Sequence, residues 1–380
     1  MKICKMYLIS IKVRGIKVSG MKKVMKVRWY DSFMGAACSA IKERLPLVDI
    51  IVHVRDARIP FSSQCELLRN CTGSSTHNII ALNKMDLAGG SALQPWMEYF
   101  RQNNFICCGV NAHNKDSIKE FLNLIQRQVR ELKRVDNRNY TATVMLIGIP
   151  NVGKSAIANA LHQVGRISAA EKGKLKHAIV SPEPRETKDI RSFKIGSHPN
   201  IYVLDTPAVL SPEVPDVDVL RKLSLTGAIG DCLVGKKEIA QYFLAILNSS
   251  EQYKKWAHLS TKADDGIFLN STTECLNSFG LHKKEKKKFP TDHTQDNIVH
   301  DVRITLYETI SCFDGNIRNE DEMDALIGRQ LCALQEAFHV SSEGGEVPHD
   351  KVAAKLLNLF RTGRLGHYIL DHLPTDIHSL

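Results

Sequence analysis

The segment Gly148–Ser155 leaves little freedom in the fold around it, because it reads Gly-Ile-Pro-Asn-Val-Gly-Lys-Ser and fits the pattern G-x-x-x-x-G-K-S/T. It lies between a short apolar run, Thr143–Ile147, and a segment with helical periodicity, Ser155–Val164. Its glycines let backbone N–H groups and a helix N-terminus point at a phosphate. We therefore predict a phosphate-binding loop between a strand and a helix; the alternative is an ordinary strand-to-helix turn.

The side chains of this loop predict which part of a nucleotide each would hold. Lys154 is expected to reach the β- and γ-phosphates, and the Ser155 hydroxyl to take one Mg²⁺ position. The residues that we expect against the phosphates are Asn151, Val152, Gly153, Lys154, Ser155 and Ala156.

A second motif, Asn83-Lys84-Met85-Asp86, predicts the base. It follows a strand-like run, Asn78–Leu82, so Asp86 can accept two hydrogen bonds from the N1–H and 2-amino group of guanine. Adenine offers no such pair, which penalises ATP. Asn83 is expected to brace the loop, and the Lys84 stem to lie over the base. The alternative is a polar turn that closes a strand.

A third strand, in Ile201–Ala208, is predicted to deliver Asp205 to the Mg²⁺ water shell. Thr187 lies in the polar, basic segment from Gly165 to Asn200, which has the composition of a mobile switch. There it would contact Mg²⁺ and the γ-phosphate.

The order of these motifs departs from that of ordinary GTPases, because N-K-x-D precedes the phosphate loop by about sixty residues. Chain ends that are close in space permit such a permutation. The chain resembles the circularly permuted GTPases, and we expect an α/β fold with a mostly parallel sheet and helices on both faces, followed by a C-terminal helical domain. The strands predicted are 48–54, 78–82, 105–110, 143–147 and 201–204, and the helices 115–133, 216–230, 237–247, 297–312, 321–338 and 348–361.

Asp56-Ala57-Arg58-Ile59-Pro60 identifies which permuted GTPases the chain resembles. This D-A-R-I-P signature is similar to that of the DAR GTPases, the YlqF/RbgA family of large-ribosomal-subunit assembly factors. Lys222–Ile229 and Phe360–Gly366 also resemble that family, and the resemblance runs from about Trp29 to Asp371. It is greatest to the plant mitochondrial members.

The resemblance implies a particular chemistry. Asn151 lies where the family's loop asparagine helps to bind K⁺, and Val209 lies where Ras-like switches carry a water-orienting glutamine. The residues expected to act in catalysis are therefore Lys154, Asn151 and Thr187, with GTP, Mg²⁺ and K⁺ bound. Slow hydrolysis, accelerated by the ribosome, follows from that arrangement.

The sequence departs from the family's pattern at three places. Ala208 replaces the D-x-x-G glycine, where a positive φ would be strained. The guanine loop reads Asn111-Ala112-His113, which keeps the Ala112 backbone donor near the base. Phe33 lies in the run that carries a histidine in many members. A ribosome- or RNA-binding scaffold with little or no hydrolysis is therefore the alternative function.

The composition indicates which partners and which cellular location to expect. The 380 residues carry a net charge of +10, which favours a polyanionic partner. Residues 1–30 hold nine Lys/Arg and no acid, as in a mitochondrial transit peptide, or in a basic arm that contacts RNA. Residues 31–232 are assigned to the GTPase domain, and residues 233–380 to a helical domain that the resemblance connects with ribosomal RNA.

Two basic clusters are candidate RNA contacts, namely the run Lys283–Lys288 and the group Arg361, Arg364 and His367. The run Lys283–Lys288 is equally typical of a solvated linker. We expect a monomer that binds the large ribosomal subunit and its rRNA, and no DNA. Its expected location is the mitochondrial matrix, and the alternative locations are the nucleolus, the cytosol and the chloroplast. No apolar run reaches the length of a membrane span, and peripheral contact with the mitochondrial inner membrane is left open. Ten cysteines without a C-x-x-C pair predict reduced thiols.

Overall fold

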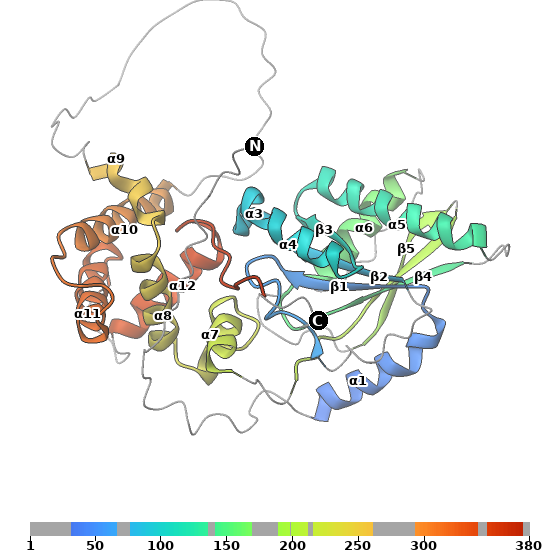
Figure 1. Cartoon of the computed structure of the whole chain (residues 1–380), viewed down its shortest axis with the longest axis horizontal. Helices are drawn as coiled ribbons and strands as arrows, with labels where there is room; N and C mark the ends of the chain where they lie inside the picture. Colours follow the sequence, from blue (N-terminus) through green and yellow to red (C-terminus); the bar gives the residue numbers. More distant parts are fainter. Residues whose placement is uncertain are drawn as a thin grey trace, which may run out of the picture. The chain divides into compact units, whose positions relative to one another are not determined.

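The computed structural model shown in Figure 1 describes residues 32–66, 77–135, 141–168, 189–197, 199–211, 216–260, 293–340 and 348–374. Three of the features named above lie outside these residues, namely the basic segment 1–30, Thr187 and the run Lys283–Lys288.

The described residues form two compact units. One, here called the sheet unit, contains the described residues from Ser32 to Ile239 and the C-terminal segment that begins at Phe360. The other, the helical unit, contains Ala240–Leu359. The sequence had assigned residues 233–380 to one helical domain, whereas this division places the end of the chain with the sheet.

A six-stranded sheet with the order β3-β2-β1-β4-β6-β5 is the framework of the sheet unit. All neighbouring strands pair in parallel except β5, which runs antiparallel to β6. The strands are β1 (Ile50–Asp56), β2 (His77–Asn83), β3 (Ile106–Val110), β4 (Ala142–Ile147), β5 (Arg191–Ser197) and β6 (Asn200–Asp205). The expected α/β class and permuted order are confirmed, because the three strands that precede the phosphate loop complete the sheet beside β4.

The register aligns the strands at their carboxyl ends. Asp56 pairs with Asn83, which pairs in turn with Val110, and Leu146 pairs with Asp205. The loops that follow β1, β2, β3, β4 and β6 therefore all leave from one edge of the sheet, where ligands of open α/β sheets bind.

Strand β5 is the element for which the sequence prediction was wrong, since Arg191–Ser197 had been included in the expected switch segment. Of its seven residues only Phe193 and Ile195 are buried. An edge strand that buries one face needs few apolar residues. With only two of them, its alternation pattern cannot be distinguished from the sequence of a polar loop.

Helices cover both faces of the sheet, with α5 (Lys115–Val135) and α6 (Lys154–Ser168) on the side opposite to α1 (Ser32–Arg44) (Figure 1). Helix α4 (Gly90–Gln102) packs Trp96 and Phe100 against Ile80 and Leu82 of β2. The short helix α3 (Met85–Ala88) follows β2, and α7 (Val217–Leu225) ends before the expected residue 230 because Gly227 has a φ of 81°. The 3₁₀ turns of this unit are η2 (Leu45–Leu47) and η3 (Asp231–Leu233).

The helical unit consists of most of α8 (Lys236–Ser249), η4 (Gln252–Trp256), α9 (Ala257–Ser260), α10 (His293–Ser311), α11 (Glu320–Ala337) and most of α12 (Pro348–Arg361). Helix α10 begins at His293, before the predicted start at residue 297. Asn248 and Gln330 exchange two buried amide hydrogen bonds, at 3.0 and 2.7 Å, so neither polar side chain is left unsatisfied in this core. None of the described helices combines the length and apolar character needed to cross a bilayer.

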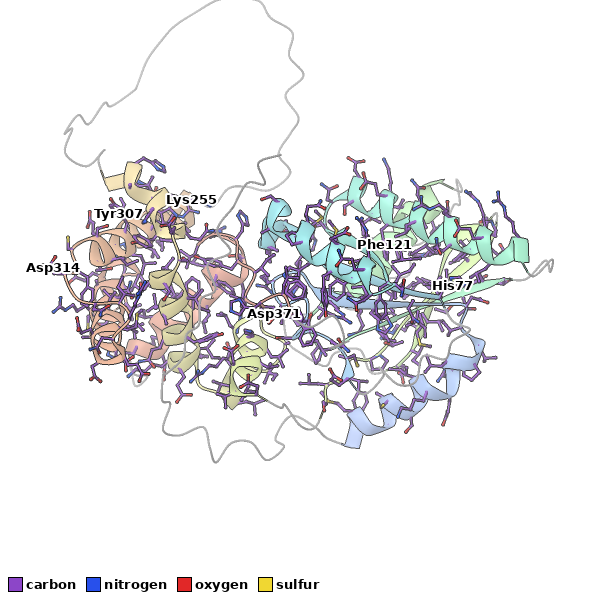
Figure 2. All side chains as sticks on the ribbon, in the orientation of Figure 1. His77, Phe121, Lys255, Tyr307, Asp314 and Asp371 are labelled. Carbon is purple, nitrogen blue, oxygen red and sulfur yellow. The ribbon has the colours of Figure 1, made fainter. Side chains whose placement is uncertain are left out.

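The C-terminal segment from Phe360 to Pro374 is part of the sheet unit, although it is distant from the sheet in sequence. Its backbone N–H groups at Tyr368 and Leu370 donate to the carbonyls of Leu87 and Arg58. Asp371, labelled in Figure 2, accepts hydrogen bonds from the backbone N–H groups of Phe61 and Ser62 at 2.9 and 2.8 Å. The segment therefore contacts the loop after β1 and the helix after β2.

Candidate functional site

Asn83 joins the phosphate loop to the loop that follows β3. Its Nδ2 donates to the carbonyl of Val152 at 2.8 Å, and its Oδ1 accepts from the N–H of Ala112 at 3.3 Å. The fit against the phosphate loop is close, because any Cβ at Gly153 would overlap the Asn83 amide, and Gly153 has a φ of +95°. The structure thus brings three of the sequence motifs together at the sheet edge, and Asn83 braces the loop.

Lys84 takes part in a buried ionic cluster that the sequence did not assign. Its Nζ donates to the carbonyl of Asn151 at 2.6 Å and lies 3.0 Å from Asp56 Oδ2. Arg58 binds the same carboxylate through Nε at 2.9 Å and Nη2 at 2.7 Å. Burial alone would raise the pKa of Asp56, but the charges of Arg58 and Lys84 outweigh it and hold that pKa well below its usual range. Burial lowers the pKa of Lys84 against the opposing effect of Asp56.

Lys154 is folded back onto its own loop. Its Nζ donates to the carbonyls of Gly148 and Ile149, each at 3.0 Å, and the residue is buried. Burial lowers the pKa of Lys154 to about 8, with Asp205 as the main opposing charge. An ammonium group held by two carbonyls is a preformed cation for an anionic ligand, because it can exchange those acceptors for phosphate oxygens.

Ser155 and Asp205 meet where the predicted Mg²⁺ would bind. The Ser155 hydroxyl donates to Asp205 Oδ2 at 2.7 Å, whereas the buried Oδ1 of Asp205 has no hydrogen-bond partner among the described residues. Burial raises the pKa of Asp205. A buried carboxylate oxygen without a donor is costly unless a cation or its bound water satisfies it, and these two oxygen ligands suit Mg²⁺. The pair fits the ion.

Asn151 has a left-handed backbone, with a φ of 57°. Its side-chain Nδ2 donates to the carbonyl of Gly227 at 3.2 Å. Because the nitrogen end of the amide is used in this way, the Oδ1 end is the one available to a cation such as K⁺. No hydrogen bond to Oδ1 occurs within the part of the chain that the structure describes.

The segment after β6 is tied to the start of the phosphate loop. Thr206 donates to the carbonyl of Leu146 at 2.6 Å, and the Val209 N–H donates to the carbonyl of Gly148 at 3.4 Å. Val209 is fully buried and has no polar side-chain atom. Ala208 is not among the described residues with positive φ, so the strain expected there is absent.

The base side of the site holds Asp86 in α3, where the carboxylate is exposed and has no hydrogen bond or ion pair with any described residue. Asn111 Oδ1 accepts from the His113 N–H at 2.9 Å, which closes the loop in which Ala112 lies. An exposed carboxylate beside a loop with backbone donors is an arrangement suited to a purine that carries an N–H and an amino group.

One sequence hypothesis needs correction: Arg361 is not a free cation for RNA. Its guanidinium forms an ion pair with Asp231 and donates to the carbonyls of Ser224 and Leu225. Phe33, in the first turn of α1, is 38% exposed.

Several residues with a place in this site had no role assigned from the sequence, namely Asp56, Arg58, Lys222, Gly227 and Asp371, and Arg361 had been assigned only to RNA binding. All of them except Asp371 lie in the short motifs that carried the family resemblance, and Asp371 lies at the end of the region that the resemblance covers. Among the described residues, no group of three or more His, Cys, Asp or Glu could hold a metal ion by itself.

Comparison with known proteins shows, independently of the site geometry, which proteins the chain is similar to. A family model described as 50S ribosome-binding GTPase matches residues 143–260. The chain is 53% identical over 348 residues to DAR GTPase 2, mitochondrial, from Arabidopsis thaliana, which covers 91% of this chain and 90% of that protein. It is 29% identical over 273 residues to ribosome biogenesis GTPase A from Priestia megaterium, covering 69% of this chain and 90% of the relative.

A solved structure described as GNP-bound YlqF from T. maritima is also similar, with a TM-score of 0.38, 26% identity, and coverage of 54% of this chain and 71% of that one. The plant match is the broadest of these, because it extends over almost the whole chain.

Proposed function

This chain belongs to the YlqF/RbgA family of GTPases, and from that premise we propose that it is a slow, K⁺-assisted GTPase that acts in the assembly of the mitochondrial large ribosomal subunit. The geometry of Asn83 carries the nucleotide part of the proposal. One side chain bridges the phosphate loop and the Ala112 loop, so the motifs for phosphate and for base form one site rather than two.

We assign separate roles to the residues that would bind the base and to those that would bind the phosphates. Asp86 selects guanine, and Ala112 supplies a backbone donor nearby. Lys154 exchanges the Gly148 and Ile149 carbonyls for oxygens of the β- and γ-phosphates, which places its charge where charge develops during phosphoryl transfer. Lys84 and Asn83 keep the loop in the shape that this exchange needs.

Ser155 and Asp205 would hold Mg²⁺, and Asn151 Oδ1 would contribute to a K⁺ site; the two ions would neutralise charge on the phosphates. Thr187 would complete the Mg²⁺ and γ-phosphate contacts. The apolar Val209 cannot orient water, so the intrinsic rate is expected to be slow and to rise when a partner completes the site.

The ribosomal part of the proposal rests on relatives and on charge. The matching family model is described as ribosome-binding, and one relative is named a ribosome biogenesis GTPase. The name of the Arabidopsis relative includes "mitochondrial", and residues 1–30 have the composition of a transit peptide. We propose that the protein works as a monomer in the matrix and binds the large subunit in its GTP state, in which Thr187 and Asp205 order the switches.

Hydrolysis of GTP by the purified protein tests the proposal, measured in K⁺ and in Na⁺ buffers with and without large ribosomal subunits. We expect turnover to be about tenfold faster in K⁺ and to rise further with subunits. Lys154→Ala should abolish turnover. Tight GTP binding without turnover under every condition, together with subunit affinity independent of nucleotide, would instead indicate a ribosome-binding scaffold.

Base selection is tested separately with Asp86→Asn. This change replaces an acceptor by a donor-containing amide, so affinity for GTP should fall about a hundredfold while affinity for xanthosine triphosphate rises. The exposed Asp116→Asn, on α5, is the matched control. A variant at Asp86 that still prefers GTP over xanthosine triphosphate contradicts the assignment.

A further inference from the structure

We propose that Arg361, in the C-terminal segment, is a positioning residue for Asn151 of the phosphate loop. The inference rests on the proposed function, because it concerns how the guanine-nucleotide site is kept ready for its ligand. The connection runs from the Arg361 guanidinium through the turn at Gly227 to the Asn151 amide.

Arg361 caps the C-terminal end of α7. The last carbonyls of a helix have no partner within the helix, and α7 ends at Leu225. Arg361 Nη2 donates to the Ser224 carbonyl at 2.8 Å and Nε donates to the Leu225 carbonyl at 3.1 Å. Its Nη1 donates to Asp231 Oδ2 at 3.0 Å, which holds the plane of the guanidinium. A lysine could not reach three acceptors in this fixed geometry.

The capped turn holds Gly227 directly between Arg361 and Asn151. Gly227 has a φ of +81°, and its N–H donates to the Ser224 carbonyl at 3.0 Å, the same oxygen that Arg361 binds. A Cβ at Gly227 would lie 3.0 Å from Asn151 Nδ2 and 3.5 Å from Arg361 Nε. The space beside the Gly227 Cα is therefore bounded by the side chains of both Asn151 and Arg361, so the turn at Gly227 is packed between them.

The Gly227 carbonyl decides which end of the Asn151 amide faces the nucleotide. A carbonyl accepts only from a donor, so it selects Nδ2 and turns Oδ1 outward. The main chain of Asn151 is held separately by Lys84, at 2.6 Å from its carbonyl. Loss of Arg361 would release the turn and leave the Asn151 side chain without a fixed orientation, while the backbone of the loop keeps its contact with Lys84.

A double-mutant cycle tests the connection, with a non-hydrolysable fluorescent GTP analogue bound to the full chain in K⁺ buffer. Dissociation constants are compared for the wild type, Arg361→Ala, Asn151→Ala and the double variant. Each single change should weaken binding about five- to tenfold, and Arg361→Ala should add less than about twofold once Asn151 is Ala. Arg361→Lys, which keeps the charge but loses the fork, should match Arg361→Ala and serves if the alanine variant does not fold.

The outcomes separate this inference from the proposed function. Effects that multiply in the double variant, or an unchanged affinity in Arg361→Ala or Arg361→Lys, overturn the positioning role even though the protein binds GTP. A wild-type protein that does not bind the analogue overturns the proposed function itself. Arg101→Ala is the matched control, because that arginine is exposed on α4 and its ion pair with Glu98 is 3.8 Å long. It should leave the affinity unchanged.

Discussion

Asp56 illustrates at the scale of one residue why an acid is buried beside the phosphate loop. Its side chain is 3% exposed and lies between Arg58 and Lys84. Without this carboxylate the buried Arg58 and the partly buried Lys84 would repel each other and would lack a counter-charge, and such a loss costs more than the ion pair itself contributes. Asp56 therefore keeps Lys84 in contact with Asn151.

Removing that carboxylate should destabilise the sheet unit strongly. We expect Asp56→Ala to cost about 3–5 kcal/mol and to lower the thermal midpoint on the order of 10 °C, because the buried Arg58 and the partly buried Lys84 lose their common partner. The measurement is a thermal unfolding scan without nucleotide. Asp116→Ala removes an exposed acid that pairs with Lys119, and should change the midpoint little. An equal, small change in both variants would show that the cluster does not support the fold.

At the scale of elements, the sequence predicted the central strands because parallel strands buried on both faces are continuous apolar runs. Ile50–Val52 and Val144–Ile147 are such runs, and each lies in a strand that leads to motif residues. Strand β5 was missed because it buries only two side chains. Burial of Asp371 could not be predicted, since a charged side chain is buried only when its partners are close in space, and Phe61, Ser62 and Lys222 are distant from it in sequence.

His53, in the centre of β1, makes the stability of this strand depend on pH. Its Nε2 is paired with Asn78 Oδ1 of β2 at 3.1 Å. Burial, and then the charge of Arg55, lower the pKa of His53 to about 4, against the effect of the Asn78 hydrogen bond. Between its ordinary value of 6.5 and about 4, the unfolded chain binds a proton that the folded chain does not. Stability from this group is complete above that window and falls as the pH falls through it.

A comparison of wild type with His53→Gln isolates this effect. Between pH 7.5 and 5.5 the wild type should lose about 1 kcal/mol more than the variant, or on the order of 3 °C more in thermal midpoint. Glutamine can keep a hydrogen bond to Asn78 and does not titrate. If both proteins lose stability in parallel over this range, His53 is not the group responsible.

At the scale of the whole molecule, the sheet unit is assembled from two separate parts of the chain. Residues up to Ile239 supply the sheet, and the segment from Phe360 returns to it after the whole helical unit has been inserted. Contacts over such separations form only after a long loop has closed, which slows folding. The sheet unit is therefore expected to be incomplete until the end of the chain has been synthesised.

Asp371 is the residue on which that closure should depend most. Its carboxylate accepts from the N–H groups of Phe61 and Ser62 and from the Ser62 hydroxyl, and it lies 3.2 Å from Lys222 Nζ. Burial alone would lower the pKa of Lys222, but Asp371 and then Asp218 outweigh it and raise that pKa. Asp371→Ala removes the acceptor of the Phe61 and Ser62 donors and leaves the buried Lys222 ammonium with Asp218 as its remaining partner, so the thermal midpoint should fall on the order of 5–10 °C.

Asp218→Ala is the matched control for Asp371→Ala, because Asp218 is the other partner of Lys222. The Asp218 side chain is 43% exposed. Water can replace that exposed partner, so the midpoint should change by about 2 °C or less. Thermal scans of both variants decide between two views of the C-terminal segment. A larger fall in Asp371→Ala means that the segment closes the sheet unit, whereas equal small falls mean that the unit is complete without it.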